Sequence, residues 1–100
     1  MSFTQIIEVE GVGDEQALHD LVASWDSEQA DVAPGYLGAR VFADQGAAGR
    51  YLVEVDFSSQ EQAQRNSDRD ETAAWATQLR GLTTGEPSYR DLRQVCTTYR

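Results

Sequence analysis

The sequence predicts an α+β fold in which one antiparallel sheet carries its helices on a single face. The clearest observation is residues 50–57, where apolar side chains alternate with charged or mixed ones, as in a strand with one buried face. The apolar members are Tyr51, Val53, Val55 and Phe57. The second observation is that strand-like and helix-like segments follow one another in the order β-α-β-β-α-β. We therefore expect residues 50–57 near the centre of a single sheet.

The first strand and the first helix are predicted in the first third of the chain. Residues 3–9 alternate with period two, and one side of this strand consists of Phe3, Gln5, Ile7 and Val9. Residues 11–13 interrupt the strand, and Gly13 or Asp14 can cap a helix. Apolar residues then recur at helical spacing, at Ala17, Leu18, Leu21, Val22 and Trp25. Pro34 and Gly35 should stop the helix.

The second half of the chain begins with another strand, residues 36–43. The loop at residues 44–49 contains two glycines, so residues 36–43 and 50–57 should form an antiparallel hairpin. Residues 58–61 match the capping box S-x-x-E, which predicts a short helix to about Asn66. Residues 67–70 look like a second cap, and Gly81 can end the following helix. The inner face of that helix is predicted to be Ala74, Trp75, Gln78, Leu79 and Leu82. Residues 89–99 are predicted as the last strand.

This order of elements suits a single domain, residues 1–100, with a ferredoxin-like sandwich fold: one four-stranded antiparallel sheet with helices on one face. The first and third strands should lie in the middle. The uncovered face would still carry Ile6, Leu52 and Leu92 beside several acidic residues. We therefore expect a homodimer in which two sheets pack face to face, with Arg40, Arg90 or Arg93 neutralising the acids at the contact.

Composition narrows the classes of function. The net charge is −9, the sequence pI is about 4.3, and every basic residue is arginine. Nucleic acid is therefore not an expected partner, because phosphate binding needs clustered basic side chains. Cys96 is the only cysteine, which excludes a CxxC site, and a buried inert thiol is the expected role. No apolar stretch is long enough to span a membrane, and no signal peptide is predicted, so the cytoplasm is the default expectation.

Five stretches follow one another across nearly the whole length: residues 34–38 (PGYLG), residues 58–63 (SSQEQA), Arg65 with Asn66, Trp75, and residues 85–92 (GEPSYRDL). In these stretches, taken together and in order, the chain resembles the antibiotic biosynthesis monooxygenase-like family of dimeric α+β barrel proteins. The resemblance implies a ligand pocket inside each subunit, between the sheet and the helices. It also implies a homodimer and a reaction with O2 that uses neither a metal nor a flavin.

Two subgroups of that family have residue patterns that this chain does not match. Quinone-forming members resemble one another in an Asn and a Trp on the third strand and a Tyr in the next helix; the corresponding positions here are Val53, Phe57 and Gln64. Haem-degrading members have an axial His in the last helix and a Trp in the short helix, which fall here near Thr77 and Ser67. Haem degradation is therefore not expected, and no catalytic residue is assigned.

The candidates for lining a pocket are Asn66, Trp75 and Tyr51. Asn66 could hydrogen-bond a phenolate or carbonyl, and Trp75 could stack on an aromatic ring. The alternative is that Asn66 caps a helix, Trp75 fills the core and Tyr51 is a half-buried sheet residue. His19 lies off the apolar stripe and is expected on the surface, and one histidine with scattered carboxylates does not predict a metal site.

The leading function that the resemblance implies is a cofactor-independent monooxygenase acting on a small aromatic, phenolic metabolite. The alternative is a non-catalytic dimer of the same fold that binds a small molecule, because the catalytic positions of the family are not matched. A third possibility is a structural partner module that acts through its acidic first helix.

Overall fold

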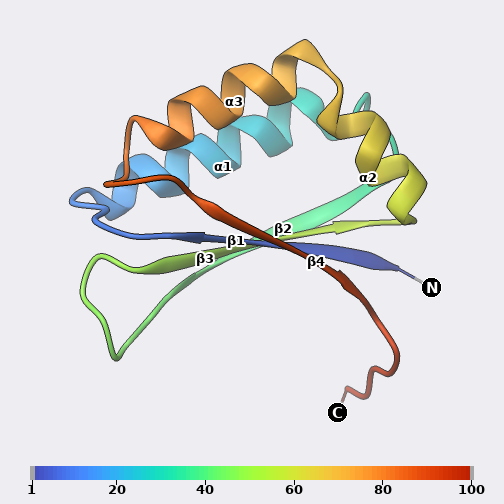
Figure 1. Cartoon of the computed structure of the whole chain (residues 1–100). Coiled ribbons are helices and arrows are strands. Elements are labelled where there is room, and N and C mark those ends of the chain that lie inside the picture. The colour runs from blue at the N-terminus through green and yellow to red at the C-terminus, as the bar shows by residue number, and fades with distance from the viewer. Residues whose placement is uncertain (1, 100) are drawn as a thin grey trace.

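The computed structural model describes residues 2–99 and contains four strands and three helices. In chain order they are β1 (Phe3–Val9), α1 (Glu15–Gln29), β2 (Tyr36–Ala43), β3 (Tyr51–Phe57), α2 (Gln60–Ser67), α3 (Asp70–Arg80) and β4 (Ser88–Arg93). Figure 1 shows all three helices on one side of the sheet, with the opposite face open. The predicted ferredoxin-like architecture is therefore confirmed.

The strands form one sheet in the order β2-β3-β1-β4, and every pairing is antiparallel. The two central strands, β1 and β3, are those expected in the middle, and they pair with Ile7 opposite Val53. The predicted hairpin of β2 and β3 is present, with a register shift between Tyr36 and Gly38. Because β1 and β3 have neighbours on both sides, their inward side chains are the natural centre of the core.

The main core lies between the middle of the sheet and the helices α1 and α3. It is a cluster of apolar side chains, namely Ile7, Val9, Val12, Leu18, Val53 and Leu79. Leu18, Val53 and Leu79 are fully enclosed. Removing a side chain of this kind by a Leu→Ala change costs about 2–5 kcal/mol, because contacts are lost and a cavity remains. A smaller cluster of Phe3, Phe57 and Ala63 lies under α2.

The helix ends agree only in part with the sequence prediction. Asp14 caps α1 as expected, because its Oδ1 accepts a hydrogen bond from the Ala17 amide at 3.2 Å. The cap of α2 is Ser59 rather than Ser58, and its Oγ accepts from the Gln62 amide at 3.2 Å. The cap predicted within residues 67–70 is wrong: α3 begins after Arg69 without a side-chain cap. Gly81 ends α3 as predicted.

The inner face of α3 also differs from the prediction at two positions. Trp75, Leu79 and Leu82 face the core, but Ala74 and Gln78 are exposed and line a groove between α1 and α3. The side chains that replace them on the sheet side are Thr72 and Ala76. The stripe is therefore rotated by part of a turn, because α3 packs against α1 as well as the sheet.

The last strand is shorter than predicted, ending at Arg93 instead of residue 99. β4 is an edge strand that pairs only with β1, and Arg93 lies opposite Phe3, the first residue of β1. Beyond Arg93 the partner strand has ended, and the contact continues through Ser2 and Gln94: the Gln94 backbone amide donates to the Ser2 carbonyl at 3.3 Å, and the Ser2 hydroxyl donates to the Gln94 side-chain carbonyl at 2.6 Å. The expectation of a buried Cys96 on this strand is wrong, because Cys96 is exposed and lies beyond β4.

The open face of the sheet carries apolar side chains surrounded by ion pairs. Phe42 and Leu92 are 44% and 45% exposed, and Ile6 and Leu52 are partly buried. Arg50 contacts Glu8 at 3.2 Å and Glu10 at 3.1 Å. Two of the arginines expected at a dimer contact are already paired within the chain, Arg40 with Glu54 and Arg90 with Glu8. Among the helices of the described residues, none is long and apolar enough to cross a membrane.

Candidate functional site

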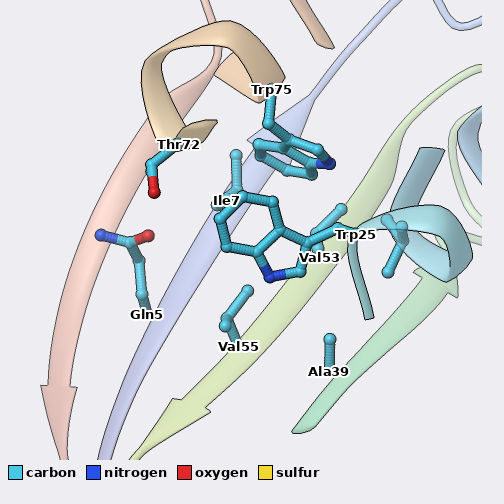
Figure 2. Close-up of a pocket in the computed structure, with 9 residues that line it drawn as sticks. Gln5, Ile7, Trp25, Ala39, Val53, Val55, Thr72 and Trp75 are labelled. Carbon is cyan, nitrogen blue, oxygen red and sulfur yellow. The ribbon is translucent and has the colours of Figure 1, made fainter. Parts of the chain in front are cut away.

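An apolar cavity lies between the sheet and the helices, at the position that the sequence resemblance implies for a ligand pocket. Its lining residues are Gln5, Ile7, Val22, Trp25, Ala39, Val53, Val55, Thr72 and Trp75. Figure 2 shows these side chains converging from three strands and two helices. The free interior space is about 40 Å³. Since a single water needs at least about 10–15 Å³, this space holds a few water molecules, and a larger ligand requires the side chains to move apart.

Local sequence patterns explain why these residues meet. On the strands they are two positions apart, Gln5 with Ile7 and Val53 with Val55, so each pair points to the same face of the sheet. On the helices they are three positions apart, Val22 with Trp25 in α1 and Thr72 with Trp75 in α3. The strand and helix periodicities that bury the core residues therefore also place the cavity residues. The cavity lies beside the main core, on the side toward α2.

The cavity lining contains no ionisable side chain. Apart from the two indole N–H groups, its polar side-chain atoms belong to Gln5 and Thr72. The Gln5 amide also donates to Asp91 at 3.3 Å. Such a lining favours a planar, uncharged molecule with few polar groups, because burial of an unpaired charge here would be costly.

The space continues from this cavity toward the edge strand β4. A neighbouring hollow of about 210 Å³ shares Gln5, Ile7, Thr72 and Trp75 with the cavity and is bounded further out by Ser67 and Tyr89. Burial raises the pKa of the Tyr89 phenol, so this phenol stays protonated at neutral pH and can only donate or accept a hydrogen bond. A ring too large for the cavity can extend in this direction between α3 and β4.

Trp75 lies where the sequence analysis expected a pocket residue. Its ring lines the cavity, and its indole Nε1 donates to the Leu21 carbonyl at 3.3 Å. It also packs edge-to-face on Trp25, with ring centroids 6.2 Å apart and an interplanar angle of 60°. Trp75 is thus held in position from α1 and presents an aromatic surface to the cavity.

Asn66 is buried, with 6% of its surface exposed, but it does not line the cavity. Its Oδ1 accepts hydrogen bonds from Arg69 at 3.2 Å and from Thr72 at 3.3 Å. The Arg69 guanidinium lies 5.9 Å from the centroid of the Trp25 ring and donates to Gln29 at 2.6 Å. Asn66 therefore holds two residues that contact the cavity or its wall, and its position is one layer behind the lining.

Tyr51 is not brought together with the other two candidates. Its Oη donates to Glu15 at 2.9 Å, and this hydrogen bond raises the pKa of the Tyr51 phenol. Tyr51 and Glu15 line a separate shallow hollow beside His19, near the far ends of β2 and β3. His19 is exposed and lies 3.0 Å from Asp20. Within residues 2–99 no group of three or more histidine, cysteine, aspartate or glutamate side chains is arranged to hold a metal ion.

Three lining residues that carry a polar side-chain group were not among the candidates from the sequence: Trp25, Gln5 and Thr72. Trp25 was assigned to the apolar stripe of the first helix, and this assignment is correct, but the stripe does not say which member faces a cavity. Gln5 carried a usable signal, because it is a polar residue on the inward side of a strand whose other inward residues are apolar. A polar group in such a place needs a partner in the interior.

Comparisons with known proteins support the fold. No protein-family model matches the sequence, and no curated protein matches it. Among solved structures, SnoaB from Streptomyces nogalater, described as a cofactor-independent oxygenase, superposes with a TM-score of 0.79 at 16% identity, covering 96% of this chain and 95% of SnoaB. A Caulobacter crescentus protein that carries the provisional name antibiotic biosynthesis monooxygenase gives a TM-score of 0.78 at 14% identity, covering 94% and 90%.

A Deinococcus radiodurans protein with the same provisional name gives a TM-score of 0.75 at 11% identity, covering 100% of this chain and 98% of that protein. The resemblance inferred from the sequence is therefore borne out at the level of the fold: over nearly its full length the chain has the fold of these solved structures. The positions at which the chain departs from the quinone-forming pattern lie apart from one another. Val53 lines the cavity, Phe57 belongs to the smaller core cluster, and Gln64 is exposed.

Proposed function

We propose that this protein binds a small aromatic molecule of the phenol or anthrone type between its sheet and its helices, and that it oxidises this molecule with O2 without a cofactor. The observation that carries the proposal is the apolar cavity beside Trp75, in a chain whose fold resembles that of a cofactor-independent oxygenase.

The chemistry asks little of the protein beyond a suitable environment. In an anthrone the ring CH2 group opposite the ketone loses a proton, and in a phenol the hydroxyl group does. The resulting anion shares its charge between the oxygen and the ring carbon opposite, and it gives one electron to O2. The two radicals combine to a hydroperoxide, and loss of water leaves a new carbonyl group, so one oxygen atom enters the product and the other leaves as water. A low-dielectric pocket with fixed hydrogen-bond donors stabilises the charge that develops on the substrate oxygen.

A second function is favoured by a specific observation, the absence of any ionisable side chain among the lining residues. A proton taken from the substrate would then have to go to water or to a group outside the cavity. A protein that binds or shields an aromatic molecule without changing it needs no such group. Binding is therefore common to both functions, and turnover separates them.

We also propose that two copies of the chain pack through the open sheet face. Support comes from Phe42 and Leu92, which are about half exposed next to Ile6 and Leu52. An exposed apolar patch of this kind on a sheet is best covered by a complementary surface, and a second copy supplies one of the same shape. Because Arg40 and Arg90 already neutralise Glu54 and Glu8 within each chain, these two acids do not oppose the contact.

Oxygen uptake in the presence of 1-naphthol or anthrone, with ¹⁸O2 and mass spectrometry of the product, tests the reaction. We expect uptake that depends on the protein and one labelled atom in the product. Ala39→Phe, which fills the cavity, should abolish uptake, whereas Ala43→Phe on the same face of β2, outside the cavity lining, should not. Binding without uptake would favour the non-catalytic function, and the absence of both would contradict the proposal.

A further inference from the structure

We infer that the indole N–H of Trp25 is a hydrogen-bond donor to a ring-borne oxygen of the ligand, so that the cavity selects aromatic ketones and phenols over hydrocarbons of the same shape. This inference rests on the proposed function, since it concerns the ligand of the same cavity. It adds a specificity-determining residue, on helix α1, that neither the sequence candidates nor the fold resemblance identify.

The two tryptophans of the cavity differ in what their N–H groups do. The Trp75 N–H is bonded to the Leu21 carbonyl at 3.3 Å. No acceptor within residues 2–99 takes a hydrogen bond from the Trp25 N–H, although Trp25 is partly buried and lines the cavity. Figure 2 shows the Trp25 nitrogen turned toward the sheet, on the side of Val55, rather than out along the helix.

The free donor faces space rather than packed atoms. In the described part of the chain every fully buried side-chain nitrogen or oxygen has a partner, so an unpaired indole nitrogen must border open volume. The lining around it is apolar, with Val53, Val55 and Ala39 on the sheet side. Water that enters this space can accept this hydrogen bond, and a ligand oxygen that displaces the water can take its place.

The orientation of the donor is fixed by its neighbours. Trp25 packs edge-to-face against Trp75, and the Arg69 guanidinium lies over its ring at 5.9 Å. Arg69 is in turn held by Gln29 at 2.6 Å and by the buried Asn66 at 3.2 Å. A donor held on two sides loses little freedom when a ligand binds, which makes its hydrogen bond more effective.

The position of the donor also suits the proposed chemistry. The cavity lining holds no cation, so the N–H dipole is the group available beside the apolar sheet positions to stabilise negative charge that develops on a ketone or phenol oxygen. Gln5 and Thr72 lie at another part of the lining, toward α3, and can contact a second polar group of the ligand. The ligand class is therefore a planar aromatic compound with an oxygen at one edge.

The test uses two probes of matched shape, 1-tetralone and tetralin, which differ in one carbonyl oxygen. The chain has two tryptophans, so a ¹⁵N spectrum shows two indole N–H signals, assigned by Trp25→Phe and Trp75→Phe. We expect 1-tetralone to move the Trp25 indole proton downfield and to leave the Trp75 indole proton nearly in place. Tetralin should bind without that downfield shift.

The binding affinities of the variants test the hydrogen bond from the Trp25 N–H to the ligand a second time. Trp25→Phe removes ring contact from both probes, but it should weaken 1-tetralone binding about threefold to tenfold more than tetralin binding, the size of one net hydrogen bond. Trp75→Phe, whose N–H is already taken by Leu21, should affect both probes alike.

Failure of this inference and failure of the proposed function give different results. If both probes bind but neither moves the Trp25 signal selectively, and Trp25→Phe treats them alike, this inference is overturned while the proposed function stands. If neither probe perturbs any signal of the cavity residues in the wild-type protein, binding in this cavity is contradicted, and both proposals fall together. The spectrum of the wild-type protein suffices for this decision even if a variant does not fold.

Discussion

The wall of the cavity depends most on the buried side chain of Asn66. It joins the end of α2 to Arg69 and Thr72, one of which lies over Trp25 while the other lines the cavity. The sequence predicted Asn66 near a helix end, where it lies, and also as a lining residue of the pocket, which it is not. The sequence could not show that the carboxamide points toward the junction of α2 and α3. That orientation depends on where Arg69 contacts α1 in the folded chain.

Replacing Asn66 with alanine should lower the free energy of unfolding by about 1–3 kcal/mol, because two donors lose their acceptor in a partly buried place. Urea denaturation measures this loss. Gln64→Ala is the matched control on the same helix: its side chain is exposed and bonds Asp68 only weakly, at 3.4 Å, so it should change the value by less than about 0.5 kcal/mol. Equal effects of the two substitutions would contradict the buried role of Asn66.

Tyr36 gives a pH dependence that can be measured at the scale of one residue. Burial raises the pKa of its phenol, and the hydrogen bond to Asp26, at 2.7 Å, raises it further. The unfolded chain loses this proton near pH 10, while the folded protein keeps it to higher pH. The stability that Tyr36 contributes is therefore fully present below about pH 10 and is lost as the pH rises through the raised folded pKa.

Tyr36→Phe keeps the edge-to-face contact with Phe57, whose ring centroid is 6.3 Å away, and removes the titrating group. The difference in unfolding free energy between the wild-type protein and this variant should be constant from pH 7 to about 9 and should shrink above about pH 10. Urea denaturation at several pH values measures it. A difference that stays constant to about pH 11 would show that Tyr36 is not shifted in the folded state.

At the scale of elements, alternation predicted the central strands well and their edges poorly. β1 and β3 are buried on the helix side, so the period of two is visible in their apolar residues. β4 is exposed along its whole length, and its end is set by where β1 begins, which no local pattern records. The rotation of α3 is likewise not recorded in a local pattern, because this helix packs against both the sheet and α1.

The same limit applies to the cavity. Trp75 was found because it is a large aromatic residue in a helix that must face the sheet. Trp25 belongs to an equally clear apolar stripe on α1. A residue of such a stripe lines a cavity, rather than filling the core, only when free volume remains beside its side chain. Free volume depends on side chains from five elements at once, so it cannot be seen in any single segment.

Two adjacent serines test how α2 begins. Ser59 caps the helix by accepting from the Gln62 amide, whereas Ser58, which the capping-box pattern indicated, is exposed and makes no such bond. Ser59→Ala should cost about 1 kcal/mol of stability in thermal or urea denaturation. Ser58→Ala should cost clearly less, and the reverse order would restore the cap predicted from the sequence.

For the whole molecule, the open face of the sheet predicts self-association. Native mass spectrometry and light scattering should find a dimer at micromolar concentration. Leu52→Asp places a charge opposite Phe42 on the open face of the sheet and should give a folded monomer, as judged by circular dichroism. Val32→Asp is the control, since Val32 is 62% exposed but lies after α1, away from the sheet. A wild-type protein that remains monomeric would contradict the proposed assembly.

The central claim is that the space between the sheet and the helices is where a small aromatic molecule binds. A crystal structure of the protein soaked with 1-naphthol tests it most directly. We expect density for the ring against Trp75 and over Val53, with the hydroxyl oxygen within hydrogen-bond distance of the Trp25 nitrogen. Density for the ring on the open sheet face or in the groove between α1 and α3, with the cavity still closed, would contradict it.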